Sequence, residues 1–489
     1  MGYHCSMAIF DFAQQSYLQL PSGFYSRCQP AIVAGPKLEC WNSHLASELS
    51  LDGLSKQEKL AYFSGNETMS NGAYLAQAYG GHQFGHYTTL GDGRAILLGE
   101  LVLKNGNRVD VQLKGAGQTP YSRGGDGKAT LRWMLKEYLY SEALYYLGLS
   151  TSRSLAVVST EEEIFRQEGP EQAAILTRVM QSHLRVGTFE WVSRTQGVSA
   201  LQKLLEYAVN RHYPELKQSD TLALDFIKHV MKMQIQTVSK WMTLGFVHGV
   251  MNTDNTSITG ETFDYGPCAF INDYNPAQVY SSIDRQGRYA FGNQPRILLW
   301  NLARLTESLL PLIDSDSKVA LKKAQDLIDS FEELYLDEYY HQMGKKIGWP
   351  SCTLITKSLL NDFLEVLSRE RYDLHHCFLH LERSLSAVGS ESFQFSSLDA
   401  WIMKWKTAIS EANFKIDEVL VLMKASNPVF ILRNEDANDA ISSFVEGDPE
   451  HFRGLVEKVA TPFRRDPNGL GALVEHYFES SNFRTYCGT

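Results

Sequence analysis

The chain has 489 residues, of which 44% are hydrophobic and 21% are charged, as in ordinary soluble globular proteins. This length can hold about two or three domains, or one two-lobed enzyme with additions. With 46 basic and 56 acidic residues, the net charge is −10, which argues against nucleic acid or an anionic membrane as a partner. No apolar run approaches the roughly 18 residues that span a bilayer, and the N-terminus lacks the features of a secretory signal. We therefore expect a cytoplasmic protein.

The first strand-like pattern begins at residue 95. Residues 1 to about 70 mix turn residues with short apolar pieces, which predicts an extension packed on the main body. The runs 95–103 and 108–114 flank an Asn-Gly turn signal. The second run alternates strictly, so that Val109, Val111 and Leu113 share one face of a strand. These features predict an antiparallel hairpin that ends at Lys114.

The elements after this hairpin predict an α+β fold. A glycine-rich loop at 115–128 precedes a helix predicted from about Thr130 to Leu147. A second strand pair is predicted at 154–158 and 173–180, with an acidic turn between the strands. The rest is mainly helical, with predicted helices at 198–211, 221–244, 296–312, 317–343, 356–369 and 397–411. We expect a small β-rich lobe at 71–195, a larger helical lobe at 196–489 and a cleft between them.

The hairpin brings candidate phosphate ligands together. Gly91, Gly93 and Arg94 form the sequence GDGR just before the first strand, where two glycines let backbone N–H groups approach phosphates. Lys114 ends the second strand, where a kinase-like lobe carries its phosphate-binding lysine. An ordinary turn and a solvated lysine are the alternatives.

The predicted helix supplies a partner for this lysine. Glu137 lies 23 residues after Lys114 and is placed to form the ion pair that orients it, while Glu142 competes for the role on the same helix. Two later arginines, Arg178 and Arg185, could each grip two phosphate oxygens. Surface salt bridges are the alternative for both arginines.

A kinase-type catalytic loop is present but altered. HGVMNTDN keeps a histidine at 248 and an asparagine at 255, the outer positions of the pattern H-x-D-x-x-x-x-N. Val250 stands where that pattern has its catalytic aspartate, and Asp264 begins an Asp-Tyr-Gly triplet nine residues after the asparagine. Asn255 and Asp264 offer hard oxygen ligands for Mg²⁺. Asp254 is then the nearest candidate base.

Histidines and cysteines give weaker signals. His82 and His86 have metal-ligand spacing, but the glycines around them argue against a metal-binding helix. Core or surface positions are the simpler interpretation of the histidine cluster at 375–380. The seven cysteines contain no C-x-x-C pair, which argues against a disulfide framework or a structural zinc site. Cys268 and Cys487 are either unrelated reduced thiols or a redox latch between the tail and the loop that carries Asp264.

Six segments carry long motifs: GGHQFG at 80–85, GDGR at 91–94, VQLKGAGQTPYSRGGDGKATLR at 111–132, SHLRVGTFE at 182–190, HGVMNTDN at 248–255 and DYGPCAF at 264–270. Together they resemble the selenoprotein O family over nearly the whole chain. The resemblance implies a protein-kinase-like, two-lobed fold without the usual catalytic aspartate. It also implies a protein adenylyltransferase, which moves AMP from ATP onto Ser, Thr or Tyr hydroxyls. ATP would bind in an orientation reversed from that in kinases.

The resemblance also assigns roles to residues. It implies that Asn255 and Asp264 hold Mg²⁺ or Mn²⁺, that Asp264 also contacts ATP, and that Asp254 accepts the proton. Eukaryotic relatives carry selenocysteine near the C-terminus, where this chain has Cys487. The other implied nucleotide contacts are Gly91, Gly93, Arg94, Lys114, Asp126, Gly127, Arg178 and Arg185.

Two rival functions remain open. The chain could be a genuine kinase in which Asp254 replaces the lost base for transfer of the γ-phosphoryl group. It could also be a catalytically dead scaffold that binds ATP and signals by conformation. Two retained metal ligands argue against the scaffold, because a scaffold needs neither.

Overall fold

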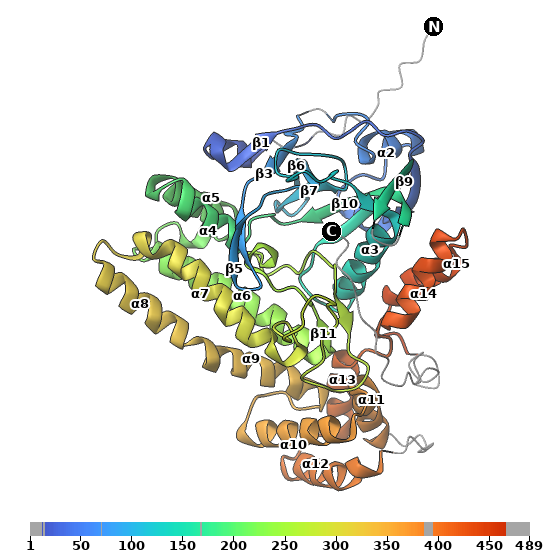
Figure 1. The fold of residues 1–489 in the computed structure, drawn as a ribbon. Helices are drawn as coiled ribbons and strands as arrows, with labels where there is room; N and C mark the ends of the chain where they lie inside the picture. The colour runs from blue at the N-terminus through green and yellow to red at the C-terminus, as the bar shows by residue number, and fades with distance from the viewer. Residues whose placement is uncertain (1–11, 13–14, 70, 167–168, 386–394, 466–489) are drawn as a thin grey trace.

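The computed structural model describes residues 12, 15–69, 71–166, 169–385 and 395–465 (Figure 1). It is a mixed α/β structure with an antiparallel sheet in the N-terminal part and a helical C-terminal region. The strand order of the sheet is β1-β3-β6-β7-β10-β9-β2, and β8 pairs with β10. Its strands are β1 (Tyr25–Arg27), β2 (Lys37–Trp41), β3 (Leu75–Gln77), β6 (Ala95–Val102), β7 (Arg108–Lys114), β8 (Ala129–Thr130), β9 (Arg153–Arg166) and β10 (Gly169–Met180).

Two short strand pairs and a series of helices complete the described fold. The pairs are β4 (Gly80–Gln83) with β5 (His86–Thr89), and β11 (Phe246–Val247) with β12 (Ala269–Phe270). The helices of the N-terminal part are α1 (Ser43–Glu48), α2 (Lys56–Phe63) and α3 (Leu131–Tyr146). Those that follow are α4 (Val186–Thr195), α5 (Val198–His212), α6 (Leu222–Leu244), α7 (Gln294–Ile313), α8 (Ser317–Asp329), α9 (Phe331–Lys346), α10 (Leu354–Glu370), α11 (Leu374–Leu385), α12 (Asp399–Glu411), α13 (Ile416–Ser426), α14 (Asn434–Val445) and α15 (Glu450–Val459).

The predicted hairpin is present as β6 and β7, and Lys114 lies opposite Ala95 at its open end. The polar face of β7 is buried rather than solvated, because side chains of α3, α5 and β10 cover it. Asp110, for example, accepts a hydrogen bond from Arg211 of α5 at 2.7 Å. The alternation thus identified the two faces of the strand correctly, but not what covers the polar one.

The first 70 residues contribute to the sheet itself. β1 pairs with β3 at one end of the strand order, and β2 pairs with β9 at the other. Both outermost strands therefore come from the segment that the sequence predicted to pack as an extension.

Two local predictions were wrong. The acidic stretch at 161–163 is not a turn but lies within β9, where pairing with β10 satisfies the backbone while the carboxylates stay exposed. The helix predicted at 317–343 is two helices, α8 and α9, which meet at Ser330. The Ser330 hydroxyl donates to the Leu327 carbonyl at 2.7 Å, a local bond of the kind that competes with helix continuation.

Helix α3 is held on its outer side by α14 and α15, which lie beside it (Figure 1). Asn434, at the start of α14, is fully buried and makes three hydrogen bonds. Its Oδ1 accepts from the Phe270 N–H at 2.9 Å and from the Tyr140 hydroxyl at 3.1 Å, and its Nδ2 donates to the Phe270 carbonyl at 2.7 Å. One side chain therefore joins α14, α3 and β12. No helix of the described ranges is long and apolar enough to cross a membrane.

We expect Asn434→Ala to lower the free energy of unfolding by about 2–3 kcal/mol, because the buried Phe270 N–H and Tyr140 hydroxyl lose their partner, while the Phe270 carbonyl loses one donor and keeps the Tyr280 hydroxyl. Urea unfolding, followed by circular dichroism, measures the change. Asn438→Ala is the matched control, since Asn438 is exposed on the same helix and should change stability by less than about 0.5 kcal/mol. Equal effects of the two substitutions would show that the buried amide does not join these elements.

Candidate active site

Four charged side chains from three parts of the fold meet beneath the sheet. The Lys114 ammonium lies 2.6 Å from Glu137 Oε2 and 2.6 Å from Asp264 Oδ1. Arg178 of β10 also donates to Asp264 Oδ1, at 2.7 Å, and to Gln112 Oε1 at 2.6 Å. We call Lys114, Glu137, Arg178 and Asp264 the ion cluster.

Strand pairing explains why two of its cations adjoin. β10 is antiparallel to β7, with Arg178 opposite Gln112 and Leu176 opposite Lys114. Side chains two residues apart in a strand point to the same face, so Gln112 and Lys114 project together toward α3. Glu137 then reaches the lysine from that helix. Glu142, the competing candidate, instead holds Arg153 through two hydrogen bonds of 2.8 Å.

The charges around Asp264 keep its carboxyl group ionised. Burial alone would raise the pKa of Asp264, but Lys114 and Arg178, followed by Arg185, outweigh burial and hold this pKa well below its usual range. The residue also has a left-handed backbone, with φ of 62°, which is uncommon outside glycine. The carboxylate of Asp264 is therefore a fixed negative charge that Lys114, Arg178 and Arg185 surround.

Arg185 lies at the start of α4 and is buried. It donates to the Asp254 carbonyl at 3.0 Å, and its guanidinium stands 4.1 Å from the ring centre of Tyr79. Asp92, in the middle of the GDGR turn, lies 3.8 Å from it. Arg185 thus connects the catalytic loop to the turn before β6.

The candidate base, Asp254, is buried in the short 3₁₀ turn Thr253–Asn255. Burial raises its pKa to about 6, although the side-chain hydrogen bond from Gln83 and the charge of Arg185 oppose this shift. Gln83 donates to its Oδ2 at 3.2 Å, while its Oδ1 is buried without a hydrogen-bond partner in the described structure. One oxygen of this carboxylate therefore accepts no hydrogen bond from the described residues.

The donor set of Asn255 and Asp264 suits a divalent cation. Asn255 donates its Nδ2 to the Val250 carbonyl at 3.0 Å, which leaves its amide oxygen for another partner. Among the described residues, no hydrogen-bond donor is found for Asp264 Oδ2, since the ion cluster uses Oδ1. An amide and a carboxylate oxygen are ligands that Mg²⁺ accepts together with phosphate oxygens and water.

The GDGR turn at 91–94 and the glycine-rich loop at 115–128 contact each other. The Ser122 hydroxyl donates to the Gly93 carbonyl at 2.5 Å, and the Thr119 hydroxyl to the Asp92 carbonyl at 2.6 Å, so the GDGR turn and the glycine-rich loop are joined. Asp126, farther along this loop, does not join the ion cluster. Its carboxylate accepts from Arg166 at 2.8 Å, while Gly127 packs against the Gly117 backbone with a positive φ of 69°.

Sequence reasoning missed the side chains contributed by the β4–β5 hairpin. Gln83 contacts Asp254, and the His82 N–H donates to Thr253 Oγ1 at 2.7 Å. The His82 ring pairs closely with Glu190 of α4, whose pKa burial raises to about 7. The GGHQFG motif was visible, but no spacing rule connects a strand pair to a loop about 170 residues later.

The remaining histidines and cysteines form no such cluster. His86 is exposed on β5, and His375 is buried on α11, where it lies 3.0 Å from the Leu244 carbonyl. No group of three or more His, Cys, Asp or Glu side chains within the described ranges could hold a metal. Cys268 is buried beneath the Asp-Tyr-Gly segment. Cys487 lies outside the described residues, so the pairing of the two thiols stays a prediction.

Comparison with known proteins shows the family of the chain. A sequence profile described as "Protein adenylyltransferase SelO" matches residues 10–460. The chain belongs to the SelO family. It is 42% identical to the protein nucleotidyltransferase YdiU of Bacillus cytotoxicus over 477 residues, with 97% of each chain covered. It is 43% identical to the YdiU protein of Clostridium botulinum strain Eklund 17B, again with 97% of each chain covered, and 44% identical to that of Anoxybacillus flavithermus, with 97% and 98% covered. As a SelO family member, the chain is a nucleotidyltransferase.

Close packing of α4 against β4 sets the position of Asp254. A methyl group added at Gly187 would lie 2.1 Å from the Gly80 carbonyl oxygen and 3.3 Å from the Asp254 Cα. We expect Gly187→Ala to lower the free energy of unfolding by about 1–3 kcal/mol through overpacking. Urea unfolding measures the loss.

Gly454→Ala is the matched helical control, because its added methyl group meets no atom within 4 Å. It should leave stability unchanged or raise it by up to about 1 kcal/mol. An equally harmless Gly187→Ala would contradict the close packing of α4 on β4.

Proposed function

We propose that the chain transfers AMP from ATP to Ser, Thr or Tyr hydroxyls of proteins and releases pyrophosphate. The observation that carries this proposal is the pairing of the ion cluster with a buried Asp254, which has one oxygen free and a raised pKa. The cations of the ion cluster suit a bound polyphosphate. The buried Asp254 carboxylate, which has no ion-pair partner in the described structure, suits a general base. Family membership supports the same reaction class.

The proposal includes a kinase-like, two-lobed arrangement. Residues 71–195 would form the nucleotide-binding lobe with 1–70 attached, and 196–489 would form the lobe that carries the catalytic loop. Support comes from the position of Lys114 and Glu137, on adjoining strand and helix, relative to Asp264 from the helical part. This is the arrangement that positions a nucleotide in kinases.

The cationic side chains would bind the triphosphate. Lys114, Arg178 and Arg185 are buried around Asp264, and Glu137 and Asp92 are the other carboxylates beside them. Arginine guanidinium groups can hold two phosphate oxygens each, which favours one orientation of the nucleotide. We propose that Gly91, Gly93 and Arg94, with Asp126 and Gly127 of the glycine-rich loop, contact the same nucleotide.

Asn255 and Asp264 would hold Mg²⁺ or Mn²⁺. Bound there, the cation would neutralise phosphate charge as pyrophosphate leaves. The ammonium of Lys114 and the guanidinium of Arg178 already face the same carboxylate. They would remain to stabilise the departing oxygens.

Asp254 would accept the proton of the acceptor hydroxyl. The acceptor oxygen forms a bond to the α-phosphorus, the bond from that phosphorus to the β-phosphate oxygen breaks, and the proton moves to the carboxylate. Val250, at the position of the kinase base, has no group that accepts a proton. The buried carboxylate of Asp254, in the 3₁₀ turn Thr253–Asn255, is the base that this loop offers.

Labelled ATP distinguishes adenylylation from phosphorylation. With ATP labelled at the α-phosphate, we expect label to remain on protein after denaturation, because the AMP moiety is retained. With label at the γ-phosphate, we expect none, because that group leaves in pyrophosphate. Retained γ-label would instead indicate a kinase, and no label from either ATP would indicate a scaffold.

Asp254→Asn should lower the rate of AMP transfer by about 100- to 10,000-fold, the range for loss of a general base. The rate of pyrophosphate release with a protein acceptor measures it. The matched control is Asp439→Asn, an exposed carboxylate of α14 that should leave the rate unchanged. Full activity of Asp254→Asn would remove this residue as the base.

Removal of divalent ions by EDTA should abolish transfer, and excess Mg²⁺ or Mn²⁺ should restore it. Asp264→Asn should stay inactive at any concentration of either ion, because it also loses the anion that orients Lys114 and Arg178. Transfer that continues in EDTA would contradict the metal site.

A further inference from the structure

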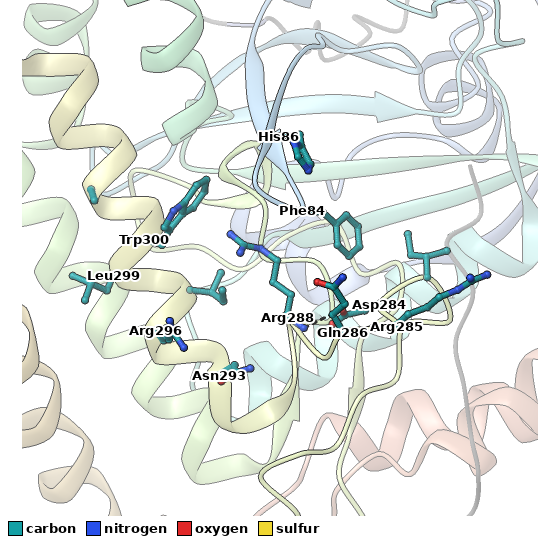
Figure 2. Close-up of a pocket in the computed structure, with 13 residues that line it drawn as sticks. Phe84, His86, Asp284, Arg285, Gln286, Arg288, Asn293, Arg296, Leu299 and Trp300 are labelled. Carbon is teal, nitrogen blue, oxygen red and sulfur yellow. Dashed lines mark hydrogen bonds between the residues drawn. The ribbon is translucent and has the colours of Figure 1, made fainter.

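A cavity of about 780 Å³ opens beside the catalytic loop, between the β4–β5 hairpin and α7 (Figure 2). None of the residues assigned above to nucleotide, metal or base lines it. The loop at 283–288 forms a third wall. The sequence motifs did not point to this loop.

The cavity is basic although the chain is acidic overall. Arg285 and Arg288 line it from the 283–288 loop and Arg296 from the first turns of α7, and Figure 2 labels the three among the lining side chains. Within the described structure, no carboxylate lies within ion-pair distance of any of the three. The acidic residue of the lining, Asp284, is engaged by its own loop, because it accepts the backbone N–H groups of Arg288 and Tyr289 at 2.9 and 2.8 Å.

Apolar surface accompanies these cations. Phe84 at the hairpin turn, Trp300 on α7 and the exposed Ile283 line the cavity. The Arg288 guanidinium lies 4.9 Å from the Trp300 ring centre, which holds this arginine against the α7 wall. A ligand here would meet cationic and apolar groups together, as a folded or extended polypeptide segment can.

Hydrogen bonds connect two walls of the cavity to the catalytic loop. The Phe84 N–H donates to the Tyr289 hydroxyl at 3.1 Å and to Asn252 Oδ1 at 3.3 Å. The Tyr289 hydroxyl in turn donates to Asn252 Oδ1 at 2.5 Å. Asn252 lies two residues before Asp254, and Gln83, the neighbour of Phe84, contacts the Asp254 carboxylate. A segment seated in the cavity would therefore continue toward the proposed base.

We propose that this cavity docks an acidic segment of the acceptor protein next to the hydroxyl that is modified. The inference rests on the proposed function and adds a substrate class to it: acceptors with Asp or Glu flanking the target residue. Charge complementarity carries the choice, since three arginines without carboxylate partners attract anionic side chains and repel basic ones. The apolar walls favour a polypeptide over a nucleic acid, and the net charge of −10 opposes nucleic acid further.

Binding of fluorescent peptides in the absence of ATP tests the cavity separately from catalysis. The probes are a fluorescein-labelled peptide whose single serine is flanked by glutamates, and the same peptide with glutamine at every glutamate. Fluorescence anisotropy should show that wild type binds the acidic peptide at least about tenfold more tightly, and that added NaCl reduces the difference.

The Arg285→Gln/Arg296→Gln variant should bring the two peptide affinities to within about twofold, because both side chains are exposed cationic walls of the cavity. Arg369→Gln/Arg464→Gln is the matched control. It removes two exposed arginines outside the cavity and should keep the wild-type difference. Circular dichroism verifies that both variants are folded.

Three results would overturn the inference: equal affinity of wild type for both peptides, an unchanged difference in the cavity variant, or tighter arginine-dependent binding of an oligonucleotide of equal charge. None of these bears on AMP transfer, which is followed separately with α-labelled ATP and a protein acceptor. Failure of that transfer alongside selective peptide binding would overturn the proposed function alone. In an active enzyme, we expect the ratio of kcat/KM for the acidic over the neutral peptide to fall about tenfold in the cavity variant.

Discussion

The buried carboxylate of Asp264 is the group on which the arrangement of the site depends. Two cations from neighbouring strands, Lys114 and Arg178, share one of its oxygens at 2.6 and 2.7 Å. Without this anion, Lys114 and Arg178 would share Glu137 alone in a buried space, where an excess of one charge is costly. Asp264 belongs to the helical part, whereas Lys114 and Arg178 belong to the sheet. Their ion pairs with Asp264 therefore also fix the position of the sheet relative to the segment that carries Asp264.

The helices at the end of the described chain serve this arrangement from a distance. Asn434 joins α14 to α3 and β12, and α3 carries Glu137 to Lys114. Lys136 of the same helix donates to the carbonyl of Gly266, the last residue of the Asp-Tyr-Gly segment, at 2.6 Å. Helix α14, which carries no sequence motif, therefore helps to hold α3, and with it Glu137, in place beside the Asp-Tyr-Gly segment.

The hairpin β4–β5 has a corresponding role on the other side of the catalytic loop. Gln83 contacts the Asp254 carboxylate, His82 contacts Thr253, and Phe84 reaches both Asn252 and Tyr289. In the part of the chain that the structure describes, its two strands pair only with each other, so packing against α4 and the catalytic loop holds it in place. The hairpin contacts the proposed base through Gln83 and lines the arginine-rich cavity through Phe84 and His86.

Local patterns in the sequence determined the β6–β7 hairpin and helix α3. Spacing within one element or loop also singled out Lys114, Glu137, Asn255 and Asp264 as candidate site residues. Tertiary structure alone decided that Glu137 rather than Glu142 meets Lys114, since helix rotation is set by packing on the sheet. It also decided that Gln83 and Asp92 join the site and that three arginines gather in one cavity. Contacts between segments far apart in the chain leave no periodicity to read, because they arise only when separate elements pack together.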